Sequence, residues 1–163
     1  MTVAVLSIGS NLGDRLAALQ GAVDAVRPWV RFTSPVFETP PWGPVPQGDY
    51  LNAVLVAADP DAAPRDWLDR AHAAEQAAGR TRDVRWGPRT LDVDVVAVDD
   101  VVSDDPELTL PHPRATERAF VLVPWLAADP QARLSGRSVA ALVEELPGED
   151  VANLRRRDDL VLR

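Results

Sequence analysis

The chain has 163 residues, of which 46% are hydrophobic, a size and composition that suit one compact domain with its own core. Its net charge of −8 argues against a protein that binds nucleic acid through a broadly basic face. It contains no cysteine, which excludes disulfides, and all 17 basic residues are arginine. The missing lysine excludes a Walker-type phosphate loop, a Schiff-base lysine and a Ser-Lys dyad, and two histidines make a closed structural zinc site unexpected.

No apolar run approaches the ~18 residues that a membrane-spanning helix needs. The N-terminal stretch, MTVAVLSIGSN, has no positively charged leader and no signal-peptide pattern. We therefore expect a cytoplasmic protein that does not associate with membranes.

The first half of the chain is predicted to begin with a strand, a helix and a second strand. Residues Val3 to Ile8 form an apolar run that ends at Gly-Ser-Asn, which indicates a buried strand and a turn. From Asp14 to about Arg27, apolar residues recur at the spacing of one helical face. Val30 to Thr39 is rich in β-branched and aromatic residues and predicts a strand, in which Pro35 indicates an edge or a bulge.

A stiff loop and a second strand-helix-strand unit follow. Residues 40–48, PPWGPVPQG, contain too many prolines and glycines for a helix or a central strand. Tyr50 to Ala58 is apolar on both faces and predicts a central strand. A helix is expected from near Asp61 to Gly79, with a proline in its first turn, and a fourth strand from Thr90 to Val98.

The order β-α-β-β-α-β is typical of a ferredoxin-like α+β fold, an antiparallel sheet with helices packed on one face. Short extended residues Leu108 to Leu110 and further helices, Thr116 to Ala127 and Ser138 to Leu146, complete the C-terminal part. There is no internal repeat and no linker, so residues 1–163 are expected to form a single domain. The arginine-rich tail, Arg155 to Arg157, is expected to be a solvated end.

The sharpest local feature is the stretch RWGPRTLDVD, residues 85–94. Residues i and i+2 of a strand share a face, so Asp92 and Asp94 are expected to point the same way. Val96 and Val98 are expected to continue that face as an apolar surface. Two neighbouring carboxylates repel each other unless a cation lies between them, which favours a hard metal ion. A pair of solvated aspartates is the alternative.

Arginines are concentrated immediately upstream of the two aspartates, within ten residues of an otherwise acidic chain: Arg80, Arg82, Arg85 and Arg89. Guanidinium groups bind phosphate oxygens through two hydrogen bonds. Carboxylates that hold Mg²⁺ next to arginines that neutralise phosphate oxygens make up a metal-triphosphate site. The alternative is a network of ion pairs between this loop and nearby aspartates.

Three polar side chains outside this stretch are further candidates. Asn52 lies on a largely apolar strand, a costly position unless its amide finds partners, and it could read the edge of a flat heterocycle or bond a neighbouring loop. His112 lies between two prolines, which suits a phosphate or nucleotide contact as well as a structural turn. His72, near Glu75 in the second helix, has a surface position as its simplest interpretation.

These stretches together resemble 6-hydroxymethyl-7,8-dihydropterin pyrophosphokinases over about residues 1 to 130. The resemblance rests on residues 85–94 and on three further stretches in the same order and spacing: IGSNLGD at 8–14, ETPPWG at 38–43 with DYLN at 49–52, and LPHP at 110–113 with RAF at 118–120. It implies transfer of the terminal pyrophosphoryl group of ATP to the hydroxymethyl oxygen of the pterin, with release of AMP, in folate biosynthesis. It also implies a monomer.

The resemblance assigns a role to each matching position. Asp92 and Asp94 would hold two Mg²⁺ ions, and Arg80 and Arg89 would stabilise charge on the phosphates. The pterin would stack between Tyr50 and Phe120, with its edge read by Asn52 and by the backbone at Thr39, Pro40 and Trp42. The nucleotide would contact the remaining positions: His72, Glu75, Arg82, Trp86, Thr109, His112 and Arg118.

Two other functions are compatible with parts of this pattern. A different metal-dependent nucleotidyl or phosphoryl transferase would share the Asp-x-Asp strand but would not need Tyr50, Asn52 and Phe120. A ferredoxin-like ligand-binding or regulatory module would need neither the paired aspartates nor the four arginines. Pyrophosphoryl transfer needs alignment and charge stabilisation rather than a protein nucleophile, which suits a chain without cysteine or lysine.

Overall fold

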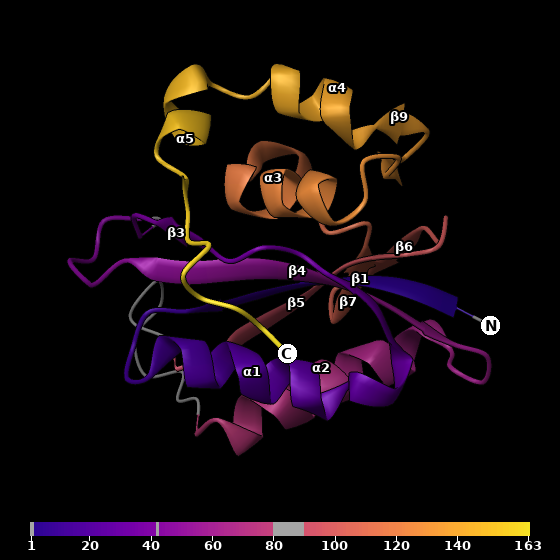
Figure 1. The fold of residues 1–163 in the computed structure, drawn as a ribbon. Coiled ribbons are helices and arrows are strands. Elements are labelled where there is room, and N and C mark those ends of the chain that lie inside the picture. Colours follow the sequence, from indigo (N-terminus) through magenta and orange to yellow (C-terminus); the bar gives the residue numbers. More distant parts are fainter. Residues whose placement is uncertain (1, 42, 80–89) are drawn as a thin grey trace.

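The structure is a computed structural model that describes residues 2–41, 43–79 and 90–163 (Figure 1). Its N-terminal part contains β1 (Thr2–Ser10), α1 (Arg15–Ala25), β2 (Val30–Thr33), β3 (Phe37–Thr39), β4 (Tyr50–Asp59), α2 (Pro64–Ala77) and β5 (Asp92–Val98). Its C-terminal part contains β6 (Ser103–Asp105), β7 (Leu108–Leu110), α3 (Ala119–Ala128), β8 (Arg133–Leu134), β9 (Arg137–Ser138), α4 (Val139–Glu144), α5 (Gly148–Ala152) and β10 (Arg155–Arg156). Two short 3₁₀ helices cover Arg27–Trp29 and Ala115–Glu117.

The main sheet is antiparallel and has the strand order β10-β3-β4-β1-β5, with β2 also paired to β4. β1 and β4 form its centre and are in register from the pair Thr2 and Asp59 to the pair Ser10 and Leu51. This arrangement confirms the expected ferredoxin-like α+β class and the central position of the strand that begins at Tyr50.

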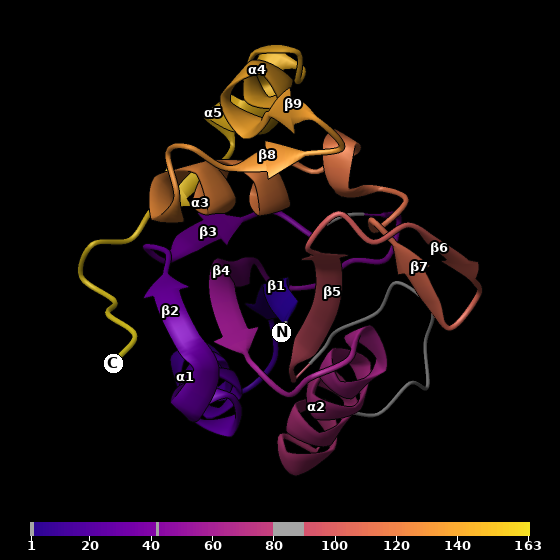
Figure 2. The same ribbon diagram turned by 90° about the vertical axis from the view of Figure 1, so that its right-hand side faces the viewer.

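Helices cover both faces of the sheet (Figures 1 and 2). α1 and α2 lie on one face, where Leu6, Leu55 and Trp67 belong to one buried cluster. α3 lies on the other face, where Val54 and Leu122 belong to a second buried cluster. The expectation of helices on one face therefore describes α1 and α2, and the C-terminal helices cover the opposite face. Among the helices of the described residues, none is long and apolar enough to cross a membrane.

The segment Val30 to Thr39 is two short strands rather than one. Both strands pair with β4, and Ser34 and Pro35 lie between them. Because proline has no N–H to donate, it interrupts the ladder. Ser34 compensates, since its N–H donates to the Val54 carbonyl at 2.9 Å and its Oγ accepts from the Val54 N–H at 2.8 Å.

The expected continuous face of β5 is also corrected. Asp92 and Asp94 pair with Gly9 and Ser7 of β1, but the register shifts between Val5 and Leu6 further along. A β-bulge places two residues of one strand opposite one of the other and reverses the alternation of faces beyond it. Val96 therefore packs on the α3 face, as expected from Asp94, whereas Val98 packs on the face of α1 and α2.

The arginine-rich tail is not simply a solvated end. Arg155 and Arg156 form β10, which pairs with Glu38 and Phe37 of β3 and extends the sheet. The chain then runs down the sheet edge to α1, where the Arg163 N–H donates to Gln20 Oε1 at 2.9 Å (Figure 2). The sequence did not reveal this because the acceptors lie more than 100 residues away along the chain.

Candidate active site

Asp92 and Asp94 lie at the start of β5, on the face that α3 covers. The intervening residue, Val93, is buried among the helices of the opposite face, and its N–H donates to Glu75 Oε2 of α2 at 3.0 Å. Both aspartates are half-buried, and Arg118 Nη1 lies 3.6 Å from Asp94 Oδ2. The prediction that the two carboxylates share a face is therefore confirmed, and both side chains are only partly exposed to water.

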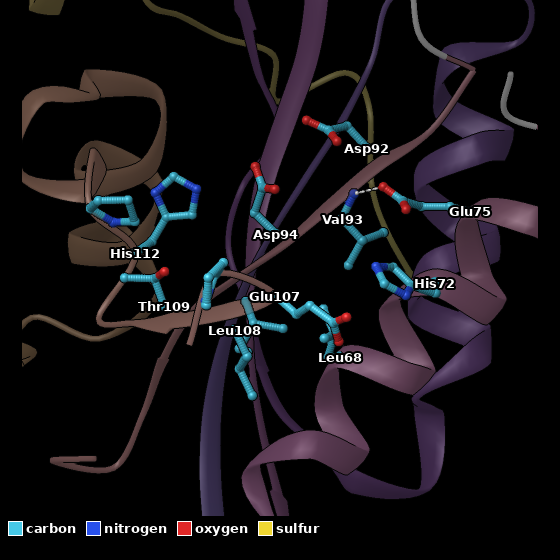
Figure 3. Close-up of a pocket in the computed structure, with 13 residues that line it drawn as sticks. Leu68, His72, Glu75, Asp92, Val93, Asp94, Glu107, Leu108, Thr109 and His112 are labelled. Atoms are coloured by element: carbon cyan, nitrogen blue, oxygen red, sulfur yellow. Dashed lines mark hydrogen bonds between the residues drawn. The ribbon is translucent and has the colours of Figure 1, made fainter. Parts of the chain in front are cut away.

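The two aspartates line a cavity of about 330 Å³ between α2, β5 and the segment from β7 to His112. Figure 3 shows Thr109 and His112 on one side of Asp94, and His72 and Glu75 of α2 on the other. Six residues that the sequence singled out for metal or nucleotide contact thus line one cavity: His72, Glu75, Asp92, Asp94, Thr109 and His112.

His112 is held in one orientation by the backbone around it. Its own N–H donates to the Val96 carbonyl at 2.7 Å, and its Nδ1 accepts from the Arg114 N–H at 3.2 Å. Burial lowers the pKa of His112 to about 4, with the charges of Arg118 and Arg114 acting in the same direction and Asp92 opposing them. The ring is therefore neutral at pH 7 and carries its proton on Nε2, as a hydrogen-bond donor. Nδ1 therefore stabilises the turn, and the Nε2 N–H remains a hydrogen-bond donor.

A second group of side chains lies on the same sheet face, towards β3. Asn52 is buried, and its Nδ2 donates to Thr39 Oγ1 at 2.7 Å. Thr39 pairs with Tyr50 in the β3–β4 ladder, and Gly9 pairs with Asn52 in the β1–β4 ladder. Phe120, at the start of α3, packs against the buried cluster of this face. The alternative that the Asn52 amide bonds a neighbouring segment is thus correct in part, because its partner lies on the neighbouring strand β3 rather than in a loop.

Loop 40–48 joins β3 to β4, and its end is attached to the first turn of the chain. Asn11 Nδ2 donates to Gln47 Oε1 at 2.6 Å and to the Gly48 carbonyl at 3.0 Å. Asn11, which directly follows β1, thus ties the end of the loop to the start of the chain. Its role was missed in the sequence, because nothing near Asn11 indicates which loop it will contact.

Several predicted residues lie outside the described part of the chain: Trp42, Arg80, Arg82, Arg85, Trp86 and Arg89. Pro40 is exposed at the start of loop 40–48. Within residues 2–41, 43–79 and 90–163, Arg118 is the arginine that approaches the aspartate pair in an ion pair. Its guanidinium also lies 5.4 Å from the centroid of the Phe120 ring, so it stands between the two groups of side chains.

The aspartate pair suits a metal ion that arrives with its substrate. Within the described residues, no group of three or more His, Cys, Asp or Glu side chains could enclose a metal. Mg²⁺ retains several waters and is commonly bound by one or two carboxylates together with substrate phosphates. Asp92 and Asp94 fit that mode of binding.

Fold and cavity together define a ferredoxin-like α+β protein with an acidic cavity at the start of β5. A family model described as 7,8-dihydro-6-hydroxymethylpterin-pyrophosphokinase (HPPK) matches residues 5–130. The chain belongs to this family.

Curated relatives agree with that assignment. The 2-amino-4-hydroxy-6-hydroxymethyldihydropteridine pyrophosphokinase of Mycobacterium tuberculosis is 49% identical in an alignment that covers 95% of this chain and 89% of the relative. The enzyme of the same name from Mycobacterium leprae is 50% identical and covers 91% of this chain and 83% of the relative. That of Pseudomonas aeruginosa is 39% identical and covers 91% and 94%.

Solved structures show the same fold at much lower identity. Wild-type Plasmodium falciparum HPPK-DHPS with pterin and p-hydroxybenzoate has a TM-score of 0.67 and 12% identity over 96% of this chain. The same protein with SDX-DHP has a TM-score of 0.66 and 13% identity. This chain spans slightly less than half of each of those chains, 45% and 47%.

Proposed function

We propose that this chain transfers pyrophosphate from ATP to the hydroxymethyl group of 6-hydroxymethyl-7,8-dihydropterin, giving the pterin diphosphate and AMP in folate biosynthesis. The observation that carries the proposal is the pair Asp92 and Asp94, side by side on one face of β5 in a cavity that other family-matching residues line. Residues 1–163 would act as one pyrophosphokinase domain.

Asp92 and Asp94 would hold two Mg²⁺ ions, which would supply positive charge to the phosphates of ATP and would help to align the attacking hydroxyl. Glu75 supports this arrangement from behind, because it binds the N–H of Val93 between the two aspartates. Arg118 lies close enough to Asp94 to compensate for its charge before substrates arrive. The pair is thus held in place by groups on both faces of the sheet.

The nucleotide would occupy the cavity between α2 and the segment from Thr109 to His112. His112, neutral and with its donor on Nε2, would give a hydrogen bond to an oxygen of ATP without taking part in proton transfer. Thr109, His72 and Glu75 would complete the walls. Arg80, Arg82, Trp86 and Arg89, which precede β5, would cover the phosphates, as the family resemblance implies.

The pterin would lie on the sheet face beside β3 and β4. Asn52 would read its polar edge, because Thr39 fixes the amide through the bond to Nδ2. Tyr50 and Phe120 would stack on its two faces, and Pro40 and Trp42 would form the rim. Such a pre-oriented polar group lowers the entropic cost of aligning the hydroxymethyl group with the phosphate chain.

The direct test is AMP release from ATP and Mg²⁺, with and without 6-hydroxymethyl-7,8-dihydropterin. Wild-type protein should release AMP only with the pterin, and Asp94→Ala should abolish this. Asp104→Ala, which changes an exposed aspartate of β6, is the matched control and should keep full activity. AMP or ADP formed without pterin would indicate a different transferase, and pterin binding without turnover would indicate a regulatory module.

The family also leads us to propose a cytoplasmic monomer that binds neither nucleic acid nor membranes. Size-exclusion chromatography with light scattering would test the first part, because a mass near twice the 17.7 kDa of the chain would contradict it.

A further inference from the structure

The carboxylate of Glu38 is buried among three arginines from distant parts of the chain. Its side chain is only 8% exposed, although it lies on the short strand β3. Arg15 of α1 approaches Oε2 at 2.7 Å, while Arg155 and Arg157 both bind Oε1, the latter at 3.1 Å. A buried carboxylate is costly unless it is paired and hydrogen-bonded, and here both of its oxygens are satisfied.

The same arginines also reach the other end of loop 40–48. Arg15 donates to the Asp49 carbonyl at 3.1 Å, and Arg155 Nη2 lies 3.7 Å from Asp49 Oδ2. Glu38 directly precedes Thr39, and Asp49 directly precedes Tyr50, which are paired in the β3–β4 ladder. The network therefore links the two ends of the loop, one residue away from two proposed pterin contacts.

Two of the three arginines come from the C-terminal tail, residues 154–163. The tail is fixed at Arg157 and beyond it: the Arg157 N–H donates to the Val36 carbonyl at 2.8 Å, and Leu160 and Leu162 pack against the core beneath the sheet. Figures 1 and 2 show it passing from α5 along the β3 edge towards α1. These residues lie beyond position 130, where the family match ends.

We propose that Arg155 and Arg157 are positioning residues for the pterin, which act through Glu38 to hold the two ends of loop 40–48 in the binding geometry. The inference rests on the proposed function for the identity of the ligand. The arginines themselves point to the opposite face of β3 from Thr39, so they act on the substrate only through the backbone of β3 and the loop.

The chain offers a matched control between the two arginines. Arg156 is exposed and pairs with Asp158, two residues further along. Arg155→Ala/Arg157→Ala and Arg156→Ala thus remove the same kind of side chain from adjacent positions, but only the former affects Glu38. Arg155→Lys/Arg157→Lys keeps the charges without the two-pronged hydrogen bonding of arginine.

The first measurement is the steady-state KM for pterin, the KM for ATP and kcat of each variant. We expect Arg155→Ala/Arg157→Ala to raise the KM for pterin about five- to tenfold, with less than a twofold change in kcat and in the KM for ATP. The double lysine variant should reverse at least half of this rise in the KM for pterin, on a logarithmic scale. Arg156→Ala should have the same kinetic constants as wild type. An unchanged KM for pterin would overturn the proposal. So would an impairment of the same fold in the KM for pterin, the KM for ATP and kcat.

A second measurement does not depend on the substrate. Hydrogen–deuterium exchange of peptides within residues 43–50 should become faster in Arg155→Ala/Arg157→Ala and remain unchanged in Arg156→Ala. Arg155→Ala alone, which removes a side chain that is 64% exposed, serves if the double variant fails to fold. An unchanged exchange rate of these peptides would refute the positioning role, whatever substrate the wild-type protein uses. If wild-type protein released no AMP in response to the pterin, only the proposed function would be refuted.

Discussion

Gly9 and Asn52 face each other across β1 and β4 so closely that a methyl group on Gly9 would lie 2.8 Å from Asn52 Oδ1. The same methyl group would lie 3.3 Å from Cδ1 of the Tyr50 ring. Both side chains therefore lie over the backbone of β1, in space that another residue would occupy. Gly9, near the end of β1, thus forms part of the floor beneath the proposed pterin site.

Gly9→Ala should weaken pterin binding more than it changes catalysis. The methyl group would displace the Asn52 amide, which Thr39 holds on its other side, so we expect a rise of about tenfold in the KM for pterin. The KM for ATP should change less than twofold. Gly21→Ala is the control, because no atom lies within 4 Å of a methyl group there. Equal kinetic constants for Gly9→Ala and wild type would show that Asn52 does not require this space.

Asp94→Asn should separate the metal requirement from stability. The amide has the same shape but carries no charge, so turnover should fall by about 100-fold or more and the Mg²⁺ concentration needed for half-maximal rate should rise. The unfolding free energy of the metal-free protein, measured by thermal unfolding, should change by about 1 kcal/mol or less. The reason is that the ion pair between Asp94 and Arg118 is partly exposed, with 3.6 Å between its charged atoms. A variant that keeps wild-type turnover would contradict the proposed metal site.

Much of this fold could be predicted because its signals are local. The apolar run along Tyr50 to Ala58, the helix start at Asp14 and the shared face of Asp92 and Asp94 each depend on a few neighbouring positions. Asp14 Oδ1 accepts from the Ala17 N–H at 3.1 Å, as a helix start with aspartate would suggest. The candidate site could be predicted for the same reason, since the two aspartates proposed to bind the metal are two residues apart.

What the sequence did not reveal depends on contacts between distant segments. The bulge that turns Val98 to the opposite face arises from the pairing of β5 with β1, where Leu6 lies opposite Val95 and Val5 opposite Ala97, far apart along the chain. The arginine network joins Arg155 to Glu38, which are 117 residues apart. A glutamate flanked by Phe37 and Thr39 gives no sign that three guanidinium groups will neutralise it.

Glu75 provides a prediction in which stability and activity change together. Glu75→Ala would leave the buried Val93 N–H without its acceptor, which costs about 1–3 kcal/mol of unfolding free energy, measured by urea titration. Turnover should also fall, because Val93 lies between the two aspartates. Glu75→Gln keeps a carbonyl oxygen as acceptor and should lose less than half as much stability. The exposed neighbour on α2 supplies a control, Gln76→Ala, and equal losses in the alanine and glutamine variants would contradict this role for the hydrogen bond.

His112 should make the metal-free protein less stable in mild acid. Its pKa is about 4 in the folded chain and about 6.5 when unfolded, so between these values the unfolded state binds a proton that the folded state does not. Stability is therefore complete above pH 6.5 and decreases as the pH falls towards 4. Since the ring is partly exposed, we expect a loss of about 1 kcal/mol rather than the ~3 kcal/mol that the full difference in pKa would give.

His112→Asn, whose Oδ1 can replace Nδ1 as acceptor for the Arg114 N–H, should remove this part of the pH dependence. The check is urea unfolding of both proteins at pH 7.5 and pH 5, and parallel losses of stability would show that another group is responsible.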